Sequence, residues 1–91
     1  MIDNHKVADE MLEWLNGQTD VEYKELKDFF IYYLNKIRNA SNLSDELKIW
    51  LEGELINTVR IKKANLDFVH GMIQIAKFIN KFNEVMENNV K

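Results

Sequence analysis

The chain has 91 residues, of which 46% are hydrophobic and 30% charged, and its net charge is −3. This length and composition indicate one globular domain and exclude a disordered chain. There is no cysteine and no proline, which excludes a disulfide framework, a thiolate zinc site and a cysteine nucleophile, and favours helices over a strand-rich fold with many turns. We therefore predict a single all-α domain over residues 1–91.

The N-terminus and the length of the apolar runs bear on where the protein resides. The first residues carry charge where a signal peptide would have its apolar core, and the longest apolar run is Phe29 to Leu34, far shorter than the ~18 residues of a membrane span. We expect a cytoplasmic protein with no membrane segment. Abundant lysine, asparagine and isoleucine are typical of AT-rich genomes, such as those of many low-GC bacteria and their phages, and we expect a phage or mobile-element source.

The first predicted helix covers about residues 4–16, where apolar residues recur at helical spacing. Gly17 follows the last apolar residue, so we expect a left-handed C-terminal cap there. Thr19 and Glu22 have the spacing of a capping box, which predicts a second helix over about residues 20–39. That helix is apolar around most of its circumference, with Ile31 and Tyr32 outside its main stripe. Such a helix is buried on several sides or contacts a partner.

Ser44 is the predicted N-cap of a third helix, with Asp45 and Glu46 in the first turn, where the helix dipole favours anions. Its stripe consists of Leu47, Leu51, Leu55 and Val59. Asn65 is a candidate cap for a fourth helix, but no glycine or proline forces a break before it. We predict a small antiparallel four-helix bundle. The alternative has three helices, and its last helix, over residues 45–90, would be ~69 Å long and would require a homodimer.

The fourth predicted helix, over about residues 66–88, carries two apolar stripes. The first consists of Leu66, Val69, Ile73 and Ala76, and the second of Phe68, Ile75, Phe78, Phe82 and Met86. A wide apolar arc indicates burial between two neighbours or binding, and aromatic side chains carry much of the energy at interfaces. We therefore predict an aromatic partner-binding face made of Phe68, Ile75, Phe78 and Phe82, together with Ile31 and Tyr32.

Two glycines, Gly53 and Gly71, fall within helical patterns, where each costs ~1 kcal/mol relative to alanine. Each is either a tolerated surface position or a point of close approach between helices, and the pattern alone leaves both interpretations open.

A basic cluster at Arg60, Lys62 and Lys63 provides an alternative function. Small helical proteins include DNA-binding transcriptional regulators, and these side chains would contact phosphates. Net negative charge and scarce arginine argue against nucleic acid as the partner.

Paired acids provide a further alternative. Glu10-x-x-Glu13 and Glu25-x-x-Asp28 lie on consecutive antiparallel helices, where four carboxylates would suit Mg²⁺. This arrangement resembles the ExxE…ExxD pattern of MazG-like nucleotide pyrophosphohydrolases, which are also helical bundles. The resemblance covers these four residues and implies Mg²⁺-dependent nucleotide hydrolysis. The chain lacks the basic residues that the family places near its acids.

Neither histidine has a nucleophile that would complete a catalytic set. The main prediction is therefore a non-enzymatic regulatory or inhibitory protein, without cofactor or metal, that binds another protein, with self-association as a homodimer as the second possibility.

Overall fold

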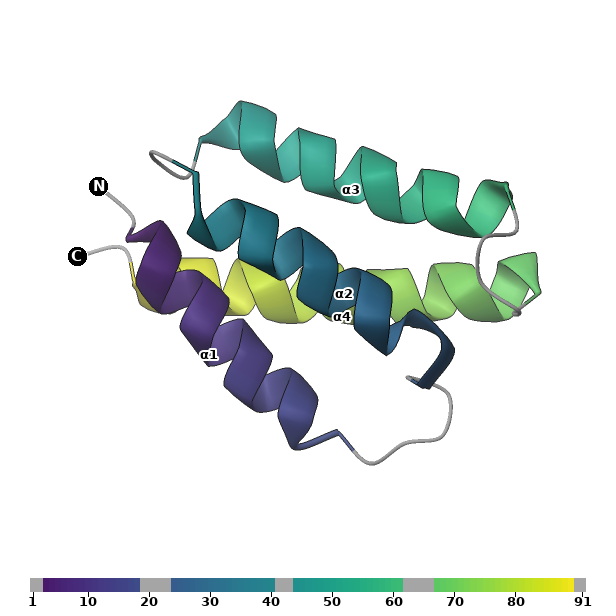
Figure 1. Ribbon diagram of the computed structural model, residues 1–91, viewed down its shortest axis with the longest axis horizontal. Coiled ribbons are helices and arrows are strands. Elements are labelled where there is room, and N and C mark those ends of the chain that lie inside the picture. The colour runs from purple at the N-terminus through teal and green to yellow at the C-terminus, as the bar shows by residue number, and fades with distance from the viewer. Residues whose placement is uncertain (1–2, 19–23, 41–43, 62–66, 90–91) are drawn as a thin grey trace.

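Four α-helices make up the computed structural model, which describes residues 3–18, 24–40, 44–61 and 67–89. They are α1 (Asn4–Asn16), α2 (Lys24–Arg38), α3 (Asp45–Arg60) and α4 (Phe68–Asn88). Successive helices run antiparallel (Figure 1). The predicted all-α four-helix bundle is confirmed. The alternative with one continuous helix over residues 45–90 is wrong, because α3 ends at Arg60 and α4 runs back along it.

Helices α2 and α4 lie at the centre of the bundle, and α1 and α3 flank them on opposite sides (Figure 1). Helix α4 packs against both α1 and α3. The start of α1 and the end of α4 lie at the same end of the bundle (Figure 1). The molecule measures 38 × 26 × 19 Å. Since the shortest dimension is about two helix diameters, every helix has one side that faces outward.

Stacked aromatic rings form the centre of the core. The rings of Phe30 in α2 and Phe78 in α4 are parallel, with centroids 4.2 Å apart, and Trp14 of α1 lies 6.5 Å from Phe78. Aliphatic side chains from all four helices surround these rings, including Met11, Leu15, Leu34, Leu51, Leu55 and Val85. The core therefore joins the four helices into one cluster.

Side chains cap the N-termini of α3 and α4. Ser44 caps α3 by accepting a hydrogen bond from the backbone N–H of Leu47 at 3.2 Å, and Asp45 and Glu46 occupy the first turn. Both predictions for α3 are confirmed. Helix α4 is capped by Asp67, whose Oδ1 accepts from the backbone N–H of His70 at 2.9 Å. Asn65 is therefore not the cap of α4.

The predicted left-handed cap at Gly17 is wrong. This residue has φ −78° and ψ −10°, which is right-handed helical geometry. Its N–H donates to the carbonyl oxygens of Glu13 and Trp14, so it continues the helical hydrogen bonding by one residue and needs no positive φ. The predicted capping box at Thr19 and Glu22 lies outside the described residues.

The two helical glycines have different surroundings. A Cβ atom at Gly71 would lie 2.6 Å from Cγ1 and 2.9 Å from Cγ2 of Val59, so the backbone of α4 passes close to α3 there. A Cβ atom at Gly53 would have no neighbouring atom within 4 Å, and Gly53 is exposed. Gly71 is therefore a point of close helix approach, whereas Gly53 is a surface position.

The buried Asn4 ties the start of α1 to the end of α2. Its Nδ2 atom donates to the carbonyl oxygens of Ile37, Arg38 and Ala40 at 3.0, 3.2 and 2.7 Å. The last carbonyls of a helix lack partners within the helix, and Asn4 donates to those of Ile37 and Arg38 at the end of α2 and to that of Ala40 just beyond it.

Candidate protein-binding surfaces

The structure separates the two apolar stripes of α4 into an inner and an outer one. Ile75, Phe78 and Phe82, which the sequence analysis assigned to partner binding, are buried in the core. That assignment is wrong for the folded chain, because these side chains pack within the core and a partner cannot reach them unless the bundle opens. The opposite stripe faces outward, with Val69 65% and Ile73 45% exposed.

Two other predicted partner-binding residues do lie on the surface. Phe68 is 55% and Tyr32 54% exposed, whereas Ile31 is half-buried and packs against the core.

Phe68 is the first residue of α4, next to the outer stripe. We define the α4 outer face as the exposed apolar residues in the first half of that helix, namely Phe68, Val69, Ile73 and Ala76. Leu66, the remaining member of the predicted first stripe, lies outside the described residues.

Helix α3 carries an exposed apolar stripe that the sequence analysis missed. Ile49 is 68% exposed, and Ile56 and Trp50 are also exposed large hydrophobic residues. Ile49, Gly53 and Ile56 are spaced four and three residues apart, so they share one side of the helix, opposite the buried Leu51 and Leu55. The spacing of Ile49 and Ile56 relative to Leu51 and Leu55 could have predicted this exposed stripe from the sequence alone. We call Ile49, Trp50, Gly53 and Ile56 the α3 outer face.

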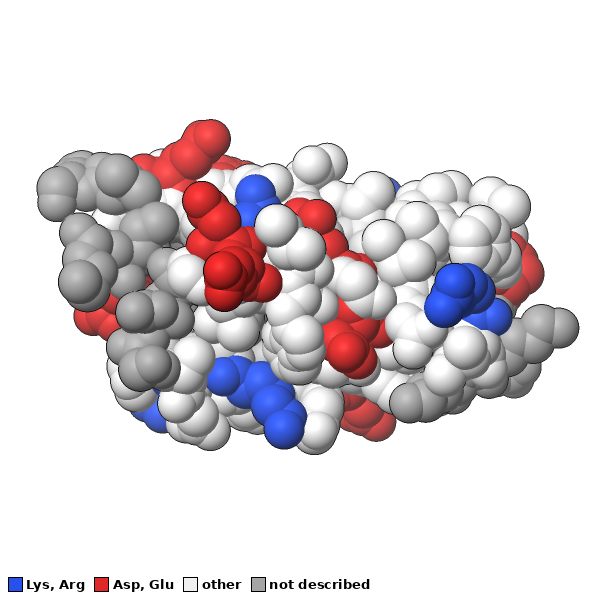
Figure 2. Space-filling model, turned by 90° about the horizontal axis from the view of Figure 1, so that it is seen from above, with Lys and Arg blue, Asp and Glu red and all other residues white. Residues whose placement is uncertain are grey.

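The side of the molecule that carries α3 is shown in Figure 2. Uncharged residues occupy much of this side, and the acidic and basic groups are scattered among them without a large area of one sign. A charged partner surface of either sign would therefore meet no extended area of like charge here.

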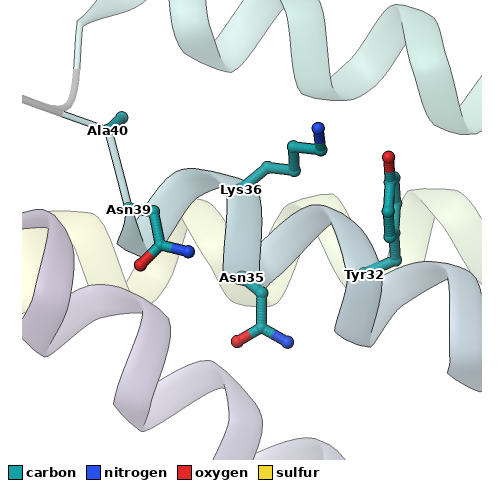
Figure 3. Close-up of a pocket in the computed structure, with 5 residues that line it drawn as sticks. All are labelled: Tyr32, Asn35, Lys36, Asn39 and Ala40. Atoms are coloured by element: carbon teal, nitrogen blue, oxygen red, sulfur yellow. The ribbon is translucent and has the colours of Figure 1, made fainter.

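Tyr32 stands beside a shallow hollow on α2. The hollow has a volume of about 440 Å³ and is lined by Tyr32, Asn35, Lys36, Asn39 and Ala40. Tyr32 and Lys36 project from the same side of α2, while Asn35 projects from another (Figure 3). The Lys36 amine lies 5.2 Å from the Tyr32 ring centroid, within the range of a cation–π contact. The hollow is thus lined by one aromatic ring, two amides, one amine and one methyl group.

A row of aromatic rings connects Tyr32 to α3. Tyr32 contacts Tyr33 edge-on, with centroids 5.2 Å apart, and Tyr33 contacts Trp50 edge-on at 5.7 Å. The Tyr33 hydroxyl lies 3.1 Å from Thr58 Oγ1. Since the Thr58 hydroxyl donates to the Glu54 carbonyl oxygen, the Tyr33 hydroxyl must donate to Thr58. Tyr33 thus fixes α2 against α3, and the exposed Tyr32 and Trp50 are held at either end of the row.

The predicted basic cluster is described only at its first residue. Arg60 is exposed, and its Nη2 atom donates to Asn57 Oδ1 at 3.1 Å. Lys62 and Lys63 lie outside the described residues. DNA binding by this cluster stays a prediction that the described geometry does not test.

The predicted carboxylate set is also described in part. Glu10 and Glu13 line a hollow with Lys81, and Glu10 Oε2 accepts from Asn89 Nδ2 at 3.4 Å. The side chain of Glu25 lies outside the described part of the chain. Within that part, no three His, Cys, Asp or Glu side chains are grouped so that they could hold a metal ion.

The pairing of Asp67 with His70 is a helix cap. The pKa of the exposed Asp67 carboxyl lies below its ordinary value of 3.8, first because the backbone N–H of His70 donates to it and second because the His70 side chain does. The Nδ1 atom of His70 contacts Asp67 Oδ2. These contacts stabilise the charged form of the cap at the positive end of the helix dipole.

Fold and surface together place the chain among small all-α helical bundles with outward-facing apolar helix surfaces. None of the helices in the described ranges is long and apolar enough to cross a membrane. No family model matches the chain, and the comparisons with curated proteins and with solved structures gave no significant match.

Proposed function

We propose that the protein is a non-enzymatic regulatory or inhibitory protein that binds another protein through the α4 outer face. The observation that carries this proposal is the exposure of Val69 and Ile73 on the side of α4 that faces away from the core. Covering apolar surface contributes about 25 cal/mol per Å². A partner that covers this stripe therefore gains binding free energy without any rearrangement of the bundle.

The arrangement of the α4 outer face suits a groove on the partner. Val69, Ile73 and Ala76 follow the spacing of four and three residues that an amphipathic helix uses when it lies in an apolar groove. Phe68 adds an aromatic side chain at the start of the helix, and aromatic side chains are frequent energetic centres of interfaces. By filling such a groove, α4 would block the ligand that ordinarily occupies it.

Substitution of the exposed stripe tests the proposal. Val69→Gln with Ile73→Gln removes apolar contact while the core stays intact, so the far-UV circular dichroism spectrum and the melting temperature should change little. Affinity for a partner isolated from the native host should fall roughly tenfold or more. Glu84→Gln, at an exposed position of the same helix, is the control and should bind as the unaltered chain does. Equal binding by all three proteins would refute the α4 outer face as the binding surface.

A further inference from the structure

Four exposed residues of α3 are placed in two symmetric pairs about Gly53, whereas Ile49 has Asn57 at its symmetric position. Glu46 lies seven residues before Gly53 and Arg60 seven residues after it, so an acid and a base occupy equivalent positions. Trp50 lies three residues before Gly53 and Ile56 three residues after it. All five residues are exposed, and at 100° per residue they share one side of α3, at the edge of which the Trp50 ring also contacts Tyr33 of α2.

Such a pattern is self-complementary when reversed. We propose that two copies of this chain pair through α3, antiparallel, with the two-fold axis passing Gly53. In a two-fold interface residue i contacts residue j of the partner and residue j contacts residue i. This register places Glu46 opposite the partner's Arg60, and Trp50 opposite the partner's Ile56, and each pairing occurs twice. The occupant of the α3 outer face is therefore a second copy of this chain.

Gly53 supports this arrangement, because the single chain gives no reason for a glycine there. No atom lies within 4 Å of the position that its Cβ would take, and a glycine within a helix costs ~1 kcal/mol relative to alanine. At a helix crossing, in contrast, a small residue lets two backbones approach closely. The position without a side chain coincides with the proposed axis, where the two helices come nearest.

An acid in the first turn and a base in the last turn of α3 suit the helix dipole, but no ion pair among the described residues joins Glu46 to Arg60. Glu46 and Arg60 are 14 residues apart, which places them ~21 Å from each other along the helix. That separation exceeds the ~10 Å screening length at 0.1 M salt. Arg60 hydrogen-bonds only locally among the described contacts, to Asn57. An interaction between positions 46 and 60 can therefore arise only between two chains.

Sedimentation equilibrium of the full chain tests the pairing. We expect a mass of twice 10.8 kDa for the unaltered protein at micromolar to millimolar concentration. Glu46→Arg and Arg60→Glu, made singly, each oppose like charges at two symmetric points and should raise the dissociation constant roughly tenfold. The double variant exchanges the charges and should restore dimerisation. Lys6→Glu, a reversal at an exposed position of α1, is the control and should leave the mass unchanged.

Three results would overturn the proposal. One is a mass of 10.8 kDa for the unaltered chain up to about 1 mM. Another is a dissociation constant that neither single charge reversal changes. The third is a double variant that folds, as its melting curve shows, but does not recover the dimer. This proposal and the proposed function can be tested separately, because the double variant Val69→Gln, Ile73→Gln should no longer bind the other protein but should still dimerise.

Discussion

Gly53 and Gly71 both lie within helices, yet alanine substitution should change the free energy of unfolding in opposite directions at the two positions. At Gly71 an added methyl group meets both γ-methyl groups of Val59 at less than 3.0 Å, so α3 and α4 must move apart. At Gly53 the added group meets nothing within 4 Å, and only the conformational benefit of alanine remains. The contrast follows from packing alone.

Gly71→Ala should therefore lower the free energy of unfolding by about 1–3 kcal/mol, whereas Gly53→Ala should raise it by about 0.5–1 kcal/mol. Urea denaturation measures both, at a dilution where sedimentation shows single chains, so that association does not contribute. Adding Val59→Ala to Gly71→Ala should cost less than the sum of the two single changes, because it removes the methyl groups that clash. Strict additivity would argue against the close approach.

Asn4 shows how one buried amide can specify the junction between two helices. Its amide donates to three carbonyl oxygens of the α2 terminus. Asn4→Ala leaves these groups without that donor and should cost about 1–3 kcal/mol. Asn4→Asp keeps the shape but directs a carboxylate at the same oxygens, so it should be more destabilising than alanine at neutral pH.

Urea unfolding at pH 7 distinguishes these outcomes for Asn4. Asn80→Asp, at an exposed position of α4, introduces the same charge and serves as the control, with little expected effect. If Asn4→Asp were as stable as the unaltered protein, the donor role of Asn4 would be refuted.

The N-terminus of α4 provides a prediction about pH. Because hydrogen bonds from His70 lower the pKa of the Asp67 carboxyl below 3.8 in the folded chain, its charged form stabilises the fold above the ordinary pKa. That contribution is lost as pH falls through the lowered pKa. Asp67→Asn retains an oxygen acceptor but no charge, so it isolates this effect.

The unaltered protein should melt above Asp67→Asn at neutral pH, and the difference should shrink once the pH falls below 3.8. Thermal melts of both proteins over a pH series measure this difference. A difference that stays constant through the acid range would show that the charge of Asp67 contributes nothing to the capping of α4.

Helices α1, α3 and α4 follow closely from local signals in the sequence. Apolar spacing, the Ser44 cap and the acidic first turn of α3 predict bounds close to those observed. The roles of Asn4 and Gly71 do not follow from such signals, since their partners are distant in sequence: Asn4 bonds to residues 33–36 positions away. The contacts of Asn4 and Gly71 depend on the three-dimensional arrangement of the helices.

The two stripes of α4 were predictable, but not which of them faces inward. Both are apolar, so periodicity gives their separation and not their orientation relative to the other helices. Large aromatic rings gain most from full burial, and Phe78 can stack on Phe30 only on the inner side. The aliphatic stripe with Val69 and Ile73 then faces outward. Because interfaces are rich in aromatic residues, the sequence alone favoured the aromatic stripe for partner binding, whereas the structure buries that stripe.

Among the described residues, the bundle as a whole leaves apolar side chains exposed on the outer faces of α3 and α4. Its shortest dimension is 19 Å, about two helix diameters, so each helix contributes one side to the core and has another side that faces outward. Apolar residues on two separate helices can therefore serve two contacts, one with a second copy and one with another protein. A dimer would present two α4 outer faces, and a partner with two matching sites would bind it more tightly than one face allows.

The inner stripe of α4 packs in the core, and we propose that the outer stripe binds. Ile73 and Ile75 separate these two roles, because they are identical side chains two residues apart that are 45% and 4% exposed. The measurement is partner affinity and thermal unfolding of Ile73→Gln and Ile75→Gln, side by side. Ile73→Gln should keep the melting temperature and lose affinity, and Ile75→Gln should unfold at a markedly lower temperature. Full affinity in a folded Ile73→Gln protein would show that the outer stripe of α4 does not bind the partner.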